Sequence, residues 1–165
     1  LMIDVKNLKK LSKEKENQNY RFRTYLKIHA DEKELDKQFK ELHKKYFKIY
    51  DCKKCRNCCK EIGISMDEFE LDKISKYLKL NKEKYIKENL EEKYGEYTFK
   101  GHKCRFLDEN NNCQIEKCLP RTCKEYPYTN HEERLFSLAG IVANASICPV
   151  VYEILEELKK EYNFR

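Results

Sequence analysis

Nine cysteines are the residues of this 165-residue chain whose types and spacing could do chemistry. The first four have the spacing C-x2-C-x2-C-C, and five more follow: Cys52, Cys55, Cys58, Cys59, Cys104, Cys113, Cys118, Cys123 and Cys148. Two residues between thiolates let a turn bring both sulfurs onto one metal ion. Lysine and arginine side chains flank the first four cysteines, and positive charge favours the thiolate over the thiol. The pattern therefore indicates metal or cluster ligation.

Two other interpretations of the cysteines are weaker. Disulfides need an oxidising compartment, the number of cysteines is odd, and a bond between the adjacent Cys58 and Cys59 would be strained. Buried, unligated thiols usually occupy apolar surroundings, whereas the first four cysteines lie among charged residues. Thiolate ligands suit zinc and iron–sulfur clusters alike, so the metal is either zinc or iron.

The number of metal centres stays open. Eight or nine thiolates are enough for two separate sites, one binuclear site, or a cluster plus an ion. Adjacent side chains such as Cys58 and Cys59 point in different directions in a regular backbone. They would therefore serve two centres, or two corners of a large cluster, more easily than one small ion.

The elements that must position the cysteines are predicted to be mostly helical. Residues 31–50 carry an apolar heptad stripe behind a capping residue, Asp31: Leu35, Phe39, Leu42, Tyr46 and Ile49. Ser65 with Glu68 predicts the start of a second helix. Asn81 predicts the start of a third that reaches about Tyr94, with Gly95 just beyond its end.

The remaining segments are less regular. Asp108–Asn112 is typical of a turn, and Pro149 fits the first turn of a last helix. Residues 134–143 predict an apolar strand or a buried segment. Residues 20–30 predict a short strand or a binding patch, because aromatic and basic side chains alternate at their start.

Composition limits the class of protein. Hydrophobic and charged residues make up 40% and 39% of the chain, so the core is small. The net charge of +6 lies entirely in residues 1–50, which hold 14 Lys or Arg and 8 Asp or Glu. No apolar run could span a membrane or form the core of a signal peptide, so we expect a cytoplasmic protein without a membrane partner.

These observations predict a mainly α fold in two parts. Residues 50–165 would form a small, irregular, cysteine-rich domain centred on metal, with a short hairpin. Residues 1–49 would form a basic, helical N-terminal extension.

The cysteine pattern resembles the YkgJ-like cysteine-cluster family, whose CxxCxxCC domain is described as chelating zinc or iron. The likeness covers about residues 50–150 and includes Cys104-Arg-Phe-Leu, Cys113-Gln-Ile, Pro120-Arg-Thr-Cys123 with Tyr126-Pro127, and Cys148-Pro149. It implies eight ligands: Cys52, Cys55, Cys58, Cys59, Cys104, Cys113, Cys123 and Cys148. Cys118 matches no ligand position, and Leu119 and Lys124 stand where the family has arginine. His102 could also ligate, but eight cysteines suffice.

The resemblance implies chelation of zinc or iron, with an iron–sulfur cluster as one form of the iron, and supplies no reaction. Some larger relatives carry the pattern in flagellin lysine methylation. An iron–sulfur enzyme, or an accessory protein in protein modification or redox chemistry, is therefore the alternative. The sequence lacks a Gly-rich nucleotide loop, which favours a protein that is not an enzyme. Beyond metal ions, we expect a protein partner through residues 31–50 rather than a nucleic acid at the aromatic and basic residues 20–25.

Overall fold

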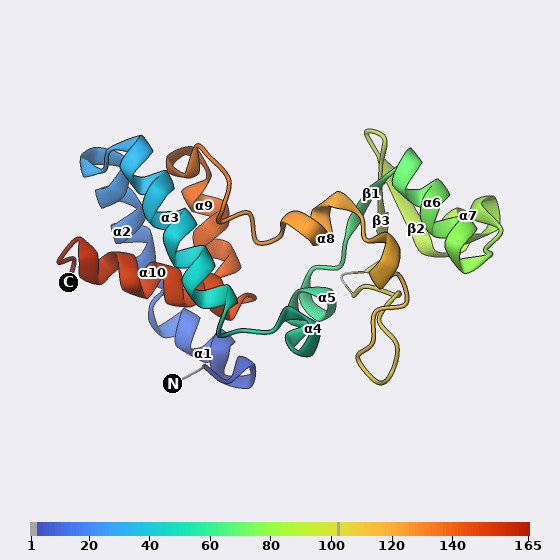
Figure 1. Cartoon of the computed structure of the whole chain (residues 1–165), viewed down its shortest axis with the longest axis horizontal. Coiled ribbons are helices and arrows are strands. Elements are labelled where there is room, and N and C mark those ends of the chain that lie inside the picture. Colours follow the sequence, from blue (N-terminus) through green and yellow to red (C-terminus); the bar gives the residue numbers. More distant parts are fainter. Residues whose placement is uncertain (1–2, 102) are drawn as a thin grey trace. The chain divides into compact units, whose positions relative to one another are not determined.

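The computed structural model describes residues 3–101 and 103–165 (Figure 1). Helices hold 62% of the chain, and one small three-stranded sheet accompanies them, which confirms the predicted mainly α fold with a short hairpin. Contacts divide the chain into two compact units. Unit 1 combines the N-terminal part up to Cys55 with Pro127–Arg165, and unit 2 is Arg56–Tyr126. The domain boundary predicted after residue 49 stays a prediction. None of the described helices is long and apolar enough to cross a membrane.

The regular secondary structure described in unit 1 consists of helices. Its helices are α1 (Val5–Glu14), α2 (Glu16–His29), α3 (Glu32–Phe47), α4 (Cys52–Cys55), α9 (Arg134–Asn144) and α10 (Pro149–Glu161). The predictions for α3 and α10 are confirmed. The Asp31 side chain accepts the Glu34 N–H at 2.9 Å, and Pro149 occupies the first turn of α10. Four members of the predicted stripe on α3 are buried where it packs against α9 and α10: Leu35, Phe39, Leu42 and Tyr46.

The strand alternatives expected for two segments of unit 1 are wrong, whereas the alternative of a buried segment for residues 134–143 agrees with the burial of Leu138, Ile141 and Val142. Residues 20–29 lie in α2, and residues 134–143 lie in α9. Their buried residues recur at helical spacing, as Phe22 with Leu26 and Leu138 with Ile141 and Val142 show. The Phe22 ring packs on Phe164 with centroids 5.0 Å apart and belongs to the core, whereas Tyr20 is 48% exposed.

Unit 2 combines short helices with the sheet. Its elements are α5 (Asn57–Glu61), β1 (Ser65–Asp67), α6 (Glu68–Leu78), α7 (Lys82–Asn89), β2 (Leu90–Lys93), β3 (Glu96–Phe99), the 3-10 turn η1 (Glu116–Cys118) and α8 (Arg121–Glu125). The sheet is antiparallel in the order β1-β3-β2. Its core is one cluster: Ile64, Met66, Leu71, Ile74, Leu90, Phe99, Cys104, Phe106 and Ile115.

Two element boundaries in unit 2 differ from the prediction. The capping box that starts α6 is formed by Asp67 and Glu70, two residues later than expected, because Ser65–Asp67 pairs with β3 as a strand. The third helix ends at Asn89. Tyr94 and Gly95 then have φ of 56° and 81°, the left-handed pair that a two-residue hairpin turn requires. Gly95 therefore closes a hairpin between β2 and β3 rather than a helix.

Candidate metal centre

The C-x2-C-x2-C-C segment is two short helices separated by one left-handed residue. Cys52 and Cys55 are the ends of α4, and Cys58 and Cys59 lie in α5. Arg56, between them, has φ of 49°. Such a conformation costs about 1–3 kcal/mol in a residue with a side chain, so its surroundings must enforce it. The boundary between the two units falls just before Arg56, so Cys52 and Cys55 belong to unit 1 and Cys58 and Cys59 belong to unit 2.

Five cysteines of unit 2 meet at one core. Cys104 is part of the core, and four others pack against it: Cys59, Cys113, Cys118 and Cys123. The Cys104 N–H donates to the Cys59 carbonyl at 2.8 Å, which ties the loop after β3 to α5. Cys113 pairs with Leu107 in an isolated β-bridge across the predicted Asp108–Asn112 turn, where the Asp108 carboxylate accepts two backbone N–H groups. Separate segments of unit 2 thus bring sulfur to one place.

The pKa values show that four of these thiols interact electrostatically. Burial, and then the nearby Cys104, Cys59 and Cys113, raise the pKa of Cys123 to about 12. Burial likewise raises the pKa of Cys104 to about 11, again with added effects of Cys59 and Cys113. For Cys118, burial raises the pKa and Cys113 is its one thiol neighbour in this respect. Cys59, Cys104, Cys113 and Cys123 therefore form a four-thiol group within unit 2.

The pKa of Cys59, in contrast, is lowered. A hydrogen bond with the Cys58 side chain is the main cause that lowers the pKa of Cys59 to about 7, and the positive charge of Arg56 adds to it. The Arg56 charge also lowers the pKa of Cys113, against the dominant effect of burial. The largely buried guanidinium of Arg56 has Nη2 3.6 Å from Glu116 Oε2. Arg56 is thus the basic residue, among those flanking the motif, whose charge favours two thiolates.

Unit 1 holds a second, smaller group of thiols. Cys148 is the N-cap residue of α10 and is buried. Burial, together with electrostatic interaction with Cys52 and Cys55, raises its pKa to about 12. Cys52 and Cys55 are three residues apart in α4, so they share one face of that helix. No local sequence pattern predicts this grouping, because Cys148 lies far along the chain from Cys52 and Cys55.

The nine cysteines all carry thiols, which offer the soft donor set that zinc and iron prefer. Within the described residues, no three His, Cys, Asp or Glu side chains are already close enough to hold a metal ion. His102 lies outside the described residues. The thiol groups are thus assembled in each unit but not drawn in to coordination distance, and the donor chemistry fits a thiolate-bound metal.

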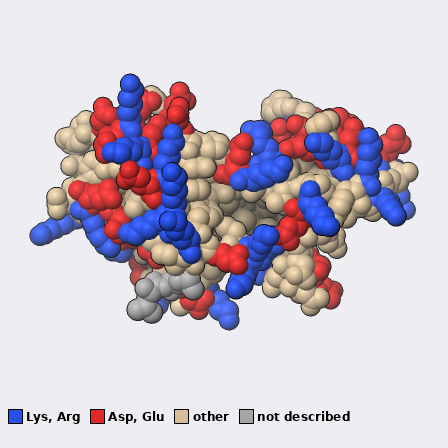
Figure 2. Space-filling model, viewed as in Figure 1, with Lys and Arg blue, Asp and Glu red and all other residues tan. Residues whose placement is uncertain are grey.

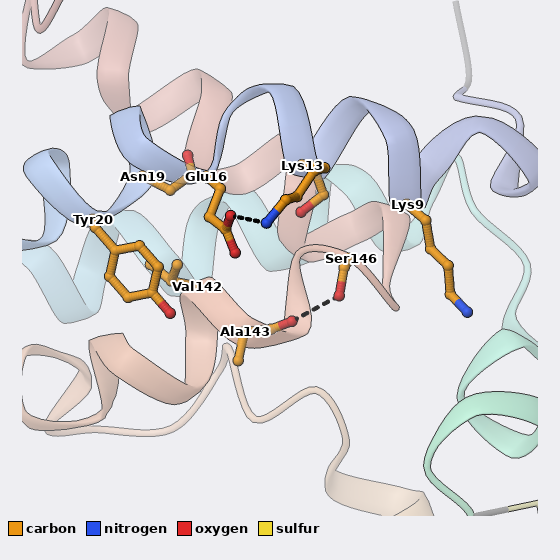
Figure 3. A pocket seen from close by; sticks show the side chains of 9 residues that line it. Lys9, Lys13, Glu16, Asn19, Tyr20, Val142, Ala143 and Ser146 are labelled. Carbon is orange, nitrogen blue, oxygen red and sulfur yellow. Dashed lines mark hydrogen bonds and ion pairs between the residues drawn. The ribbon is translucent and has the colours of Figure 1, made fainter.

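Unit 1 also has a polar hollow of about 320 Å³ between α1, α2 and α9 (Figure 3). Lys13 and Glu16 form an ion pair at its rim, and Tyr20 and Ser146 line it. No cysteine is among its lining residues, so this hollow is separate from the thiol groups.

Thiols gathered in each unit of a mainly α fold are the kind of donor set that a small metal-chelating domain needs. The family model CxxCxxCC, described as a "Putative zinc- or iron-chelating domain", matches residues 51–149. The match covers more than half of the chain, and the chain belongs to this family. No curated protein and no solved structure matches it. The resemblance to the CxxCxxCC domain is confirmed; the assignment of individual ligands stays a prediction.

Proposed function

We propose that this protein chelates zinc or iron through eight cysteine thiolates arranged in two groups. The unit 2 group is Cys59, Cys104, Cys113 and Cys123, with Cys58 beside Cys59. The unit 1 group is Cys52, Cys55 and Cys148. The observation that carries the proposal is the mutual electrostatic effect of four thiols on one core in unit 2. A set of nine thiols also fits a reducing compartment such as the cytoplasm.

The role that fits this arrangement is structural. Among residues 100–101 and 103–126, the regular helical structure that the structure describes is a 3-10 turn and a five-residue helix, and the unit 2 core is small. Small domains with thin cores often depend on metal, and a structural zinc site contributes on the order of 10 kcal/mol to folding. When bound, the metal would supply bonds that cross-link α5, α8 and the segment between β3 and η1. Arg56 assists by favouring the thiolates of Cys59 and Cys113.

The test is elemental analysis of untagged protein purified without oxygen, together with acid-labile sulfide and a visible spectrum. We expect about one metal centre for each thiol group. Zinc with no colour would indicate a structural or metal-handling protein, whereas iron with labile sulfide and a brown colour would indicate a cluster. The proposal would be overturned if the protein contained no metal as purified and its far-ultraviolet circular dichroism spectrum did not change on addition of zinc or iron.

The fold limits the surface through which residues 31–50 could bind the predicted protein partner. The apolar stripe of α3 is buried within unit 1, apart from Ile49, which is 47% exposed. A partner of this segment would therefore bind the outward face of α3, which is polar.

A further inference from the structure

Helix α3 carries two stripes of side chains on opposite faces. Each buried apolar residue follows a lysine by two positions: Lys33 and Leu35, Lys37 and Phe39, Lys40 and Leu42, Lys44 and Tyr46, and, just after the helix, Lys48 and Tyr50. Two residues along a helix correspond to a rotation of about 200°. The lysines therefore lie on the face opposite the core.

This lysine face, defined as Lys33, Lys37, Lys40, Lys44 and Lys48, is narrow and continuous. At 100° per residue its members fall within a sector of about 80°, and none of the four acidic residues of α3 falls within that sector. Four of the lysines are exposed, and Lys40 is partly exposed. From Lys33 to Lys48 the face is about 22 Å long. Figure 2 shows lysine and arginine side chains in a column over α3.

Two lysines of the lysine face form ion pairs, and both pairs are weak because they are exposed to solvent. Lys37 Nζ lies 3.9 Å from Glu34 Oε2, and Lys40 Nζ lies 3.2 Å from Glu132 Oε1. All four side chains are at least 40% exposed, and exposed pairs of this kind contribute about 1 kcal/mol or less. Both lysines can therefore exchange their carboxylate for a phosphate.

We propose that the lysine face of α3 binds the phosphate backbone of a nucleic-acid duplex. Its length matches about six phosphates of one strand, which are spaced at 3.4 Å along the axis. Lysines supply point charges without the planar donors that read base edges, so the binding would be independent of base sequence.

The surroundings of the face favour a duplex over the other polyanions. A helix that lies in a membrane surface needs a free apolar face, and that of α3 is buried in unit 1. Single-stranded nucleic acids need exposed aromatic rings for stacking. Phe47, the aromatic residue beside the lysine face, instead packs on His43 with ring centroids 4.3 Å apart.

The experiment measures binding of the metal-loaded, full chain to a fluorescein-labelled 20-base-pair DNA duplex between 50 and 200 mM NaCl. Five phosphate contacts would give a slope of log K against log salt of about −4.5. The triple variant Lys33→Gln, Lys40→Gln, Lys44→Gln should reduce the magnitude of that slope by about 3. Its matched control is Lys84→Gln, Lys87→Gln, Lys93→Gln, which removes the same charge from exposed positions in unit 2 and should leave the slope unchanged.

Three results would overturn the proposal: no binding of the duplex by the unaltered chain at 50 mM NaCl, an equal loss in both triple variants, or binding of vesicles that contain phosphatidylserine without binding of the duplex. The second result would mean that net charge alone attracts the duplex. The metal content of all three proteins is measured in the same preparations and should be equal. Failure here would therefore leave metal chelation unaffected.

Discussion

At the scale of single residues, the cysteines of unit 2 differ in how readily they lose a proton. The pKa of Cys59 is about 7, whereas burial raises the pKa of Cys104 to about 11 and that of Cys123 to about 12. Metal binding requires thiolates, so the high-pKa thiols must release protons when metal enters. Cys59 is therefore the thiol best suited to make the first bond to the metal.

This difference gives a pH dependence of metal affinity. At about pH 8, Cys59 is largely deprotonated, while the raised pKa values of Cys104, Cys113 and Cys123 keep these thiols protonated without metal. The logarithm of the apparent zinc affinity of unit 2 should therefore rise by about 3 per pH unit. Competition with a chromophoric chelator at several pH values measures it. An affinity independent of pH would contradict thiol ligation.

Single substitutions separate ligands from the remaining thiol. Cys59→Ser should lose the metal of unit 2 and lower the melting temperature, because it removes one member of the four-thiol group. Cys118→Ser should keep its metal, because Cys118 interacts electrostatically with Cys113 alone among the thiols. Elemental analysis and thermal unfolding of both variants check this. Full metal retention in Cys58→Ser and Cys59→Ser would refute the assignment.

His43 provides a residue-scale prediction outside the metal centre. Its Nδ1 lies 2.8 Å from Oγ1 of the buried Thr129. Burial, and then the charge of His131, lower its pKa below the ordinary 6.5. The neutral ring is therefore favoured in the folded state. Its contribution to stability is complete above pH 6.5 and is lost as the pH falls through the folded pKa.

Urea unfolding at pH 7.5 and pH 6.0 tests this effect. The loss of unfolding free energy between the two values should be smaller in His43→Gln than in the unaltered chain. His29→Gln, at an exposed position in α2, should behave like the unaltered chain. An equal loss in all three proteins would show that His43 does not carry the effect.

At the scale of elements, the packing of α3 sets the stability of unit 1. Phe39 is fully buried against the neighbouring helices, so Phe39→Ala should cost about 3–5 kcal/mol of unfolding free energy. Lys37→Ala, on the opposite face of the same helix, should change it by less than about 0.5 kcal/mol. Denaturant unfolding of both variants measures the difference. A similar cost for both would contradict the burial of this stripe.

The elements that were predicted correctly are those that residues within the element itself specify, such as a capping residue or a proline in the first turn. In α3 a capping residue and an apolar stripe agree, and in α10 Pro149 marks the first turn. Of the two alternatives for residues 134–143, a strand or a buried segment, the strand failed because α9 is apolar on nearly all sides, which hides its helical period. The helix expected to reach Tyr94 failed because pairing of β2 with β3 overrides local propensity.

At the scale of the whole molecule, the sequence predicted the family and left the division of the ligands open. The C-x2-C-x2-C-C spacing identifies the first four cysteines, but the left-handed Arg56 divides them between two units. That division depends on packing between distant segments, as does the placement of Cys148 beside the thiols of α4. Spacing alone carries no such information.

The most direct measurement is the rate at which each cysteine is alkylated by iodoacetamide, read by peptide mass mapping before and after a strong chelator removes the metal. We expect eight cysteines to be protected in the metal-loaded protein and exposed by the chelator: Cys52, Cys55, Cys58, Cys59, Cys104, Cys113, Cys123 and Cys148. Cys118 should react at a similar rate in both states. If each of the nine cysteines were alkylated at the same rate before and after the chelator, this result would contradict thiolate chelation.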